Sequence, residues 1–108
     1  METGNLFADV TPPSEGERTE TLMTRRNLLI ERIVSSAAIT SREYVQATDE
    51  WVVLLRGTAQ LEVAGKRVEL KSGDYLLLPA GMPHTVQRVS QGALWLAIHH
   101  SSDSASPA

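Results

Sequence analysis

The sequence predicts an all-β domain in which antiparallel strands form a sandwich or a barrel. Three observations favour this class: short apolar runs recur at close spacing, turn-forming residues separate them, and no segment shows a convincing amphipathic helical pattern. The chain has 108 residues, of which 42% are apolar and 21% charged. This composition is typical of one globular domain with a modest core, and it excludes disorder throughout the chain.

The first half of the chain is expected to begin with an arm and to continue into two strands. Residues 1–26 are polar and predict an N-terminal arm or loop, within which residues 20–23 could form either a short helix or a strand. Residues 27–34 are rich in Leu, Ile and Val and short enough for a strand. A polar loop or weak strand follows over 35–48. Residues 51–55 are nearly all apolar, which indicates a strand covered on both faces.

Residues 60–70 carry the clearest hairpin signal. Apolar and polar residues alternate on both sides of a turn that contains Gly65. In one register Glu62 faces Arg67, and in the other it faces Glu69. Like charges directly opposite each other are unfavourable by a few tenths up to about 1 kcal/mol, so we predict the first register. Gly65 then supplies the positive φ that a tight hairpin requires.

Further strands are expected in the second half of the chain, over residues 75–78, 84–89 and 93–99, with a turn at 90–92. We therefore place the barrel at residues 27–100. The remaining residues, 101–108, are Ser, Asp, Ala and Pro, and they predict a disordered tail.

The turn between two of these strands is the most informative stretch, and it reads Pro-Ala-Gly-Met-Pro-His over residues 79–84. Pro79 cannot donate to a strand ladder and Gly81 can take positive φ, so the chain is expected to turn sharply there. Pro83 restricts the preceding residue to extended geometry, so that a new strand begins with His84 at its mouth. A neutral imidazole held at the rim of a sheet is a natural metal ligand or proton carrier.

Residues 73–88 resemble the second motif of the cupin superfamily, which is G-x-x-x-x-x-P-x-G-x-x-H-x-x-x-N. Every position matches except the last, where Arg88 stands in place of Asn. The resemblance extends over about residues 27–99, and it implies the double-sheet jelly-roll barrel of cupins.

The first cupin motif, G-x-x-x-x-x-H-x-H, then three or four residues and E-x-x-x-x-x-x-G, is only half present. Its Glu and its final Gly are Glu50 and Gly57. With the shorter spacing its two His positions hold Tyr44 and Gln46, and with the longer spacing they hold Glu43 and Val45. The leading Gly is replaced by Ala in both cases.

The resemblance implies a metal site inside the barrel, and four residues here fall at its ligand positions. Glu50 and His84 carry over directly, Gln46 could offer a carbonyl oxygen, and Tyr44 could offer a phenol oxygen. Such a divalent metal would be Fe, Mn, Ni, Zn or Cu. The set is poor in nitrogen, so a site without metal is equally compatible with the sequence. Glu50 and His84 would then form a catalytic acid/base pair.

Several other residues have a less specific meaning. His99 and His100 are adjacent, so they face opposite sides of a strand. If one of these faces lines the interior, one of the two could approach His84 from an adjacent strand, but a strand end next to a serine-rich tail is the expected setting. Apolar Val52 and Leu54 are expected to line the cavity beside Glu50. The main aromatic residues, which we expect in the core or in an interface, are Trp51, Tyr75 and Trp95.

Charge and composition limit the partners. A formal net charge of -3 and the lack of a basic stripe argue against nucleic acid. No apolar run approaches the ~20 residues of a membrane span, no secretory signal is recognisable, and cysteine is absent, so a cytoplasmic protein is expected. A homodimer is expected because small jelly rolls have exposed edges and one open face.

Three functions remain compatible with the sequence. The first is a small cupin enzyme that acts on a small organic molecule in the barrel, and the second is a non-catalytic module that binds or senses a metabolite. The third is a purely structural dimer whose cavity is filled by side chains. The enzyme is our first hypothesis, and the incomplete first motif counts for the second, because metal chemistry tolerates the loss of ligands less well than binding does.

Overall fold

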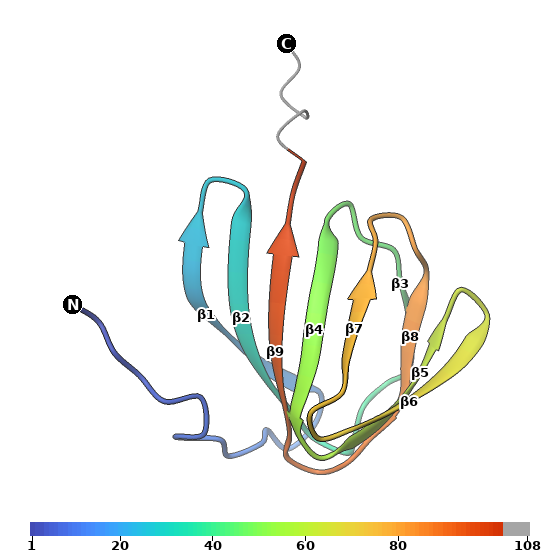
Figure 1. The fold of residues 1–108 in the computed structure, drawn as a ribbon. Coiled ribbons are helices and arrows are strands. Elements are labelled where there is room, and N and C mark those ends of the chain that lie inside the picture. The colour runs from blue at the N-terminus through green and yellow to red at the C-terminus, as the bar shows by residue number, and fades with distance from the viewer. Residues whose placement is uncertain (103–108) are drawn as a thin grey trace.

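A computed structural model describes residues 1–102 of the chain. These residues form two antiparallel sheets and no helix, which confirms the predicted all-β class (Figure 1). The strands are β1 (Glu17–Arg25), β2 (Leu28–Ser35), β3 (Glu43–Tyr44), β4 (Asp49–Arg56), β5 (Thr58–Val63), β6 (Lys66–Lys71), β7 (Tyr75–Leu78), β8 (His84–Val89) and β9 (Ala93–His100). The described residues therefore contain no helix that could cross a membrane.

The two sheets have the interleaved strand order of a jelly roll. The five-stranded sheet has the order β1-β2-β9-β4-β7, and the four-stranded sheet has the order β3-β8-β5-β6. Apart from the pairs β1–β2 and β5–β6, neighbouring strands are not consecutive in sequence, as with β4 and β9, because the chain crosses repeatedly between the sheets. Figure 1 shows the sheets meeting at the lower end of the molecule and separating toward the upper end.

The hairpin of β5 and β6 has the predicted register. Glu62 pairs with Arg67, as expected from the charge argument. Ala64 and Gly65 occupy the turn with φ values of 50° and 81°. Two successive positive φ angles give the right-handed twist that a two-residue hairpin needs, and this requirement selects the register together with the charges.

The N-terminal segment, expected to be an arm or loop over residues 1–26, contains a full strand. Of the two forms left open for residues 20–23, the structure has the strand, since β1 pairs with β2 from Glu17 to Arg25. A bulge between Thr21 and Met23 interrupts the register and leaves Leu22 exposed. Most of β1 is polar because one edge of the strand is free and much of its surface faces water.

Arg32 on β2 holds residues 5–8 against the outer face of the five-stranded sheet. It is only 6% exposed, its guanidinium pairs with Glu20, and it donates hydrogen bonds to the carbonyls of Leu6 and Ala8. A buried cation needs such complete pairing, since desolvation of an unpaired charge is costly. Residues 5–8 therefore lie on this sheet of their own chain.

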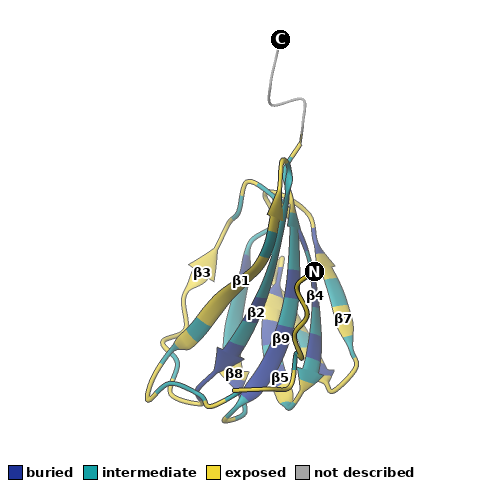
Figure 2. Cartoon of the chain, turned by 90° about the vertical axis from the view of Figure 1, so that its left-hand side faces the viewer, coloured by how far each residue is buried: buried dark blue, intermediate teal, exposed yellow. Residues whose placement is uncertain are grey.

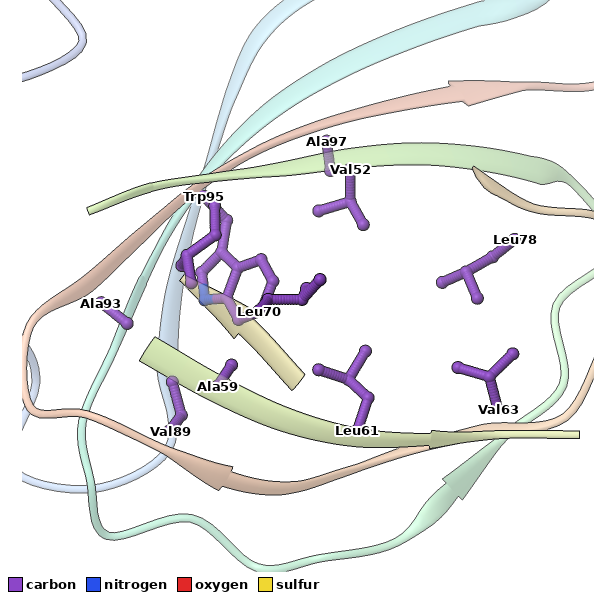
Figure 3. Packing of buried hydrophobic residues seen from close by; sticks show 11 residues of the cluster. Val52, Ala59, Leu61, Val63, Leu70, Leu78, Val89, Ala93, Trp95 and Ala97 are labelled. Atoms are coloured by element: carbon purple, nitrogen blue, oxygen red, sulfur yellow. The ribbon is translucent and has the colours of Figure 1, made fainter. Parts of the chain in front are cut away.

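The core lies between the two sheets, near the end at which they meet. Figure 3 shows Val52 and Ala97 from one sheet pointing toward Leu61 from the other, with the Trp95 indole between the layers. In β4 and β5 the buried residues alternate with more exposed ones, whereas β2 and β9 also bury residues at successive positions (Figure 2). The period of two in β5 is what its alternating sequence predicts.

The outward face of β4 is only partly covered, which differs from the expectation of a strand buried on both faces. Val52 and Leu54 are buried, whereas Trp51 and Val53 on the other side are half-buried. Trp51 packs against Tyr75 of the edge strand β7, with ring centroids 5.6 Å apart. Of the tail expected over residues 101–108, residues 103–108 lie outside the described part of the chain.

Candidate functional site

A cavity of about 250 Å³ lies between the sheets. Its apolar walls include Val52, Leu61, Leu78 and Trp95, which Figure 3 shows projecting from both layers. The polar and ionisable side chains at this cavity are Glu17, Thr19, Glu31, Tyr44, Gln46, Glu50, His84 and His99. All four residues predicted as site residues are therefore brought together. Leu54, expected beside Glu50, instead packs in the core away from the cavity lining.

Glu50 and His84 approach the cavity from opposite sheets. Glu50 lies on β4 and is 8% exposed, while His84 is the first residue of β8 and is 7% exposed. The turn before His84 is tied to the segment before Glu50, because Gly81 N–H donates to the Gln46 carbonyl at 2.8 Å. Gly81 has φ 82°, as the sequence predicted for this turn. The turn thus positions one motif residue against the other.

The carboxyl group of Glu50 lies in an environment that disfavours its charge. Burial raises the pKa of Glu50, and the nearby carboxylate of Glu31 adds to this rise. His99, His84 and a hydrogen bond from Gln46 act in the opposite direction, with smaller effect. Desolvation therefore dominates, and the protonated form of this carboxyl is favoured over a wider pH range than in water.

The imidazole of His84 has its orientation fixed from two sides. Its Nδ1 lies 3.2 Å from the carbonyl oxygen of Met82, and since a carbonyl can only accept, Nδ1 carries the proton in this contact. The Tyr44 ring stacks on the imidazole with a centroid distance of 5.9 Å. In the neutral ring, Nε2 is then a free hydrogen-bond acceptor at the cavity.

Gln46 contributes an unsatisfied acceptor. Its side-chain Oε1 is buried and has no hydrogen-bond partner among the described residues. A buried amide oxygen without a partner costs about 1–3 kcal/mol, so such an atom is uncommon in a closed core. Gln46 also lines the cavity, but its Oε1 has almost no exposed surface, so a ligand donor would reach this oxygen only if the side chain rotated.

His99 and Glu31 complete the polar wall, and the sequence analysis selected neither of them as a site residue. His99 Nε2 lies 2.9 Å from Glu31 Oε1, and both side chains are largely buried. The expectation of a strand end outside the site is therefore wrong for His99, whereas His100 is exposed. The available signal was the shared face of Trp95, Ala97 and His99, since the first two are core residues.

A second buried chain of hydrogen bonds leads from the core to the rim of the cavity. The indole N–H of Trp95 donates to Ser35 Oγ at 3.0 Å, and this hydroxyl donates to Glu17 Oε2 at 3.3 Å. Partial burial raises the pKa of Glu17, the bond from Ser35 opposes the rise, and the carboxylate of Glu50 adds to it. Glu17 and Glu50 therefore interact electrostatically across the cavity.

The donor set does not fit a firmly bound transition metal. Among residues 1–102, no group of three or more His, Cys, Asp and Glu side chains is arranged to hold a metal ion. At the motif positions, His84 is the single nitrogen donor, and the Tyr44 hydroxyl instead accepts a hydrogen bond from Arg42 Nε at 3.0 Å. Stable sites for these metals usually use three or four nitrogen, sulfur or carboxylate ligands.

These features define a small jelly-roll barrel with a polar cavity between its sheets. The model of the cupin domain family matches residues 33–99, and the chain belongs to this family. The resemblance of its two motifs to those of cupins is thereby confirmed. Among proteins with curated descriptions, none matches this chain.

Solved structures of similar proteins agree with the fold. A Ralstonia eutropha protein described as a "putative mannose-6-phosphate isomerase" is 33% identical, with a TM-score of 0.83 over 94% of this chain and 100% of that chain. An RmlC-like cupin from Desulfovibrio desulfuricans is 19% identical, with a TM-score of 0.78 over 93% and 96% of the two chains. KdgF from a Halomonas species is 13% identical, with a TM-score of 0.73 over 83% and 84%. The last two support the fold alone.

Proposed function

We propose that this chain binds a small organic molecule in the barrel cavity, between Glu50 and His84, without a resident metal. The observation that carries the proposal is the cavity itself, whose apolar walls surround a few convergent polar groups. The free Nε2 of His84 is an acceptor that a ligand can satisfy. The alternative of a weakly held divalent metal would use Glu50, His84 and Gln46.

A catalytic version of this function is the second candidate. The raised pKa of Glu50 favours its protonated form, which can donate a proton, and the free Nε2 of His84 can accept one. With these groups on opposite walls, a ligand could gain a proton from one and lose a proton to the other, with no net oxidation. An isomerisation would have this balance.

The phosphate ester in the description of the Ralstonia protein is not part of our proposal. No Lys or Arg is among the described residues that line this cavity. Phosphate groups are normally bound by Arg or Lys side chains, or by the N–H groups of a helix N-terminus. The described residues include no helix.

We also propose that the chain forms a homodimer through the outer face of the five-stranded sheet. Tyr75 and Leu77 on its edge strand are 67% and 57% exposed, and Trp51 continues the apolar surface beside them. In a twofold dimer the same surface of each copy would be covered by the other. This would remove the patch from water and protect the free edge of β7.

Metal analysis and ligand screening test the proposed function. We expect protein purified without chelator to contain far less than one metal ion per chain, and we expect Glu50→Gln and His84→Ala to leave that content unchanged. A stoichiometric metal that both substitutions remove would contradict the metal-free site. A thermal-shift screen of small neutral and charged metabolites should yield ligands that stabilise the wild type and have less effect on both variants. If none of these compounds raised the melting temperature, a purely structural role would be favoured.

A further inference from the structure

The cavity has an excess of negatively charged side chains. Three carboxylates line it, those of Glu17, Glu31 and Glu50, and no Lys or Arg does so among the described residues. His99 pairs with Glu31 and lies, like His84, near Glu50, while Glu17 accepts a hydrogen bond from Ser35, so no permanently charged cation faces Glu17 and Glu50 in the cavity. Charges withdrawn from water without a partner are unfavourable, so a positive group placed between them would be attracted.

The cavity also has more free hydrogen-bond acceptors than free donors. Gln46 Oε1 is a buried acceptor without a partner, and Nε2 of the 7% exposed His84 is a second acceptor with no donor from the protein. The carboxyl group of Glu50 adds more acceptor capacity on the opposite wall. A ligand that satisfies these atoms must bring several N–H or O–H donors, and it must not bring another negative charge.

A groove next to the cavity has a similar character. This larger groove of about 690 Å³ shares Glu17, Thr19, Tyr44 and Val86 with the cavity and also includes Glu15. The cation in this groove is Arg42, which lies over the Tyr44 ring at 5.0 Å and donates to its hydroxyl. Arg42 does not line the inner cavity, so it does not neutralise the carboxylates there.

We infer that the ligand of this cavity is a small organic ammonium compound, bound with its nitrogen between Glu50 and Nε2 of His84 and its apolar part against the Val52 and Leu61 wall. An ammonium group has three N–H donors and one positive charge, which matches both imbalances. The inference rests on the proposed function, since it specifies the chemical class of the molecule in the same site. Carboxylates and phosphate esters are excluded by the same charges.

A matched series of probes that differ only in the head group tests this inference. Cyclohexylamine, cyclohexanol, cyclohexanecarboxylate and cyclohexyl phosphate share one apolar ring that suits the aliphatic walls. Binding to the wild-type chain is followed by NMR chemical shifts and by thermal shift near neutral pH. We expect cyclohexylamine to bind at least about tenfold more tightly than cyclohexanol, and the two anions not to bind.

Two variants test whether Glu50 is responsible for the preference for the ammonium compound. Glu50→Gln keeps the shape of the side chain and removes its charge, so it should reduce the affinity for cyclohexylamine at least about tenfold and leave that for cyclohexanol within about twofold. Glu43→Gln removes a carboxylate from the exposed strand β3 and is the matched control, with no expected effect. If Glu50→Gln does not fold, the series on the wild type still decides the question.

The other outcomes separate the two proposals. Binding of cyclohexanol or cyclohexanecarboxylate as tightly as cyclohexylamine would overturn the ammonium inference and leave the proposed cavity function intact. Displacement of cyclohexylamine by stoichiometric Zn²⁺ or Mn²⁺, dependent on Glu50, would mean that an inorganic cation supplies the charge, which contradicts both proposals. Silence of all four probes in both measurements would also contradict both.

Discussion

Glu31 and His99 meet on the inner face of the five-stranded sheet, with His99 Nε2 2.9 Å from Glu31 Oε1. The two residues come from neighbouring strands and are 68 positions apart in sequence. Neither belongs to a cupin motif, yet their pair forms the wall of the cavity beside Glu50, which lies directly opposite His99 in the sheet. The polar site is therefore larger than the part that the motifs define.

We expect Glu31→Ala to destabilise the chain by about 1–3 kcal/mol, because the imidazole of His99 would remain largely buried without a partner. Urea unfolding at neutral pH measures this change. Glu43→Ala removes an exposed carboxylate from β3 and should change the free energy of unfolding by less than about 0.5 kcal/mol. Equal effects of the two substitutions would show that the buried pair contributes nothing.

Ser35 connects the Trp95 indole to Glu17, and it is fully buried. Ser35→Ala should cost about 1–3 kcal/mol, since the indole N–H would lose its acceptor in an apolar core. The indole N–H resonance of Trp95 should shift in the NMR spectrum, while that of Trp51 should not. Ser41→Ala, at an exposed position, is the control for the loss of a hydroxyl. An unchanged stability and an unchanged resonance would mean that this bond does not form.

The elements that the sequence predicted well are those in which local chemistry and tertiary structure agree. The β5–β6 register depended on which charged residue faced Glu62 and on the glycine in its turn, both of which are local. The turn at residues 79–83 was equally local, because Pro and Gly restrict the backbone themselves. Glu50 and His84 could be placed in one cavity because the family motifs encode that pairing.

The elements that were missed depend on contacts between distant residues. β1 has few apolar residues, and its pairing with β2 brings it into the sheet, where its outward-facing side chains need no apolar pattern. His99 is next to a polar tail, and only the register of β9 between β2 and β4 shows that it points inward. Glu31 is an isolated charge in an apolar strand, and its role depends on His99.

Gly57 is the glycine at which an added methyl group would collide with the fold. Its φ is 105°, and a Cβ atom there would lie 2.6 Å from Ser90 Oγ and 3.1 Å from the backbone of Ala93. Gly57→Ala should therefore destabilise the chain by about 2–4 kcal/mol, through backbone strain and overpacking together. Thermal unfolding monitored by circular dichroism measures this effect.

Gly65 provides the control for that substitution. Its φ is 81°, but a Cβ atom there would have no neighbour within 4 Å. Gly65→Ala should lower the free energy of unfolding by about 1–2 kcal/mol, because its only unfavourable effect is an alanine at positive φ. If Gly57→Ala proved no more harmful than Gly65→Ala, the close approach of the loop at Ser90 to Gly57 would be refuted.

The apolar outer surface predicts a change of oligomeric state. If a second copy covers it, Leu77→Lys places a charge in the interface and should convert the dimer to a monomer at micromolar concentration, as measured by size-exclusion chromatography with light scattering. Leu22→Lys changes an exposed leucine on the bulge of β1, at the opposite edge of the sheet, and should leave the dimer intact. A wild-type chain that is monomeric at high concentration would contradict the proposed dimer.

Glu50 makes the stability of the chain depend on pH in a definite direction. Burial raises the pKa of this carboxyl in the folded chain above its ordinary value of 4.5. At a pH between the pKa of the unfolded chain and that of the folded chain, the folded chain therefore binds more protons than the unfolded chain. The free energy of unfolding therefore decreases as the pH rises through this window, and the loss persists at higher pH.

Glu50→Gln removes this loss while keeping the shape of the side chain. We expect the variant to be more stable than the wild type at about pH 7.5, and we expect the difference to disappear below about pH 4, where both states of the wild type are protonated. Urea unfolding over this pH range measures it. Some pH dependence should remain in the variant, because burial also raises the pKa of Glu17. A variant that is less stable at pH 7.5 would mean that the ionised carboxylate is stabilised by its neighbours, His99 and His84 above all, by more than its burial costs.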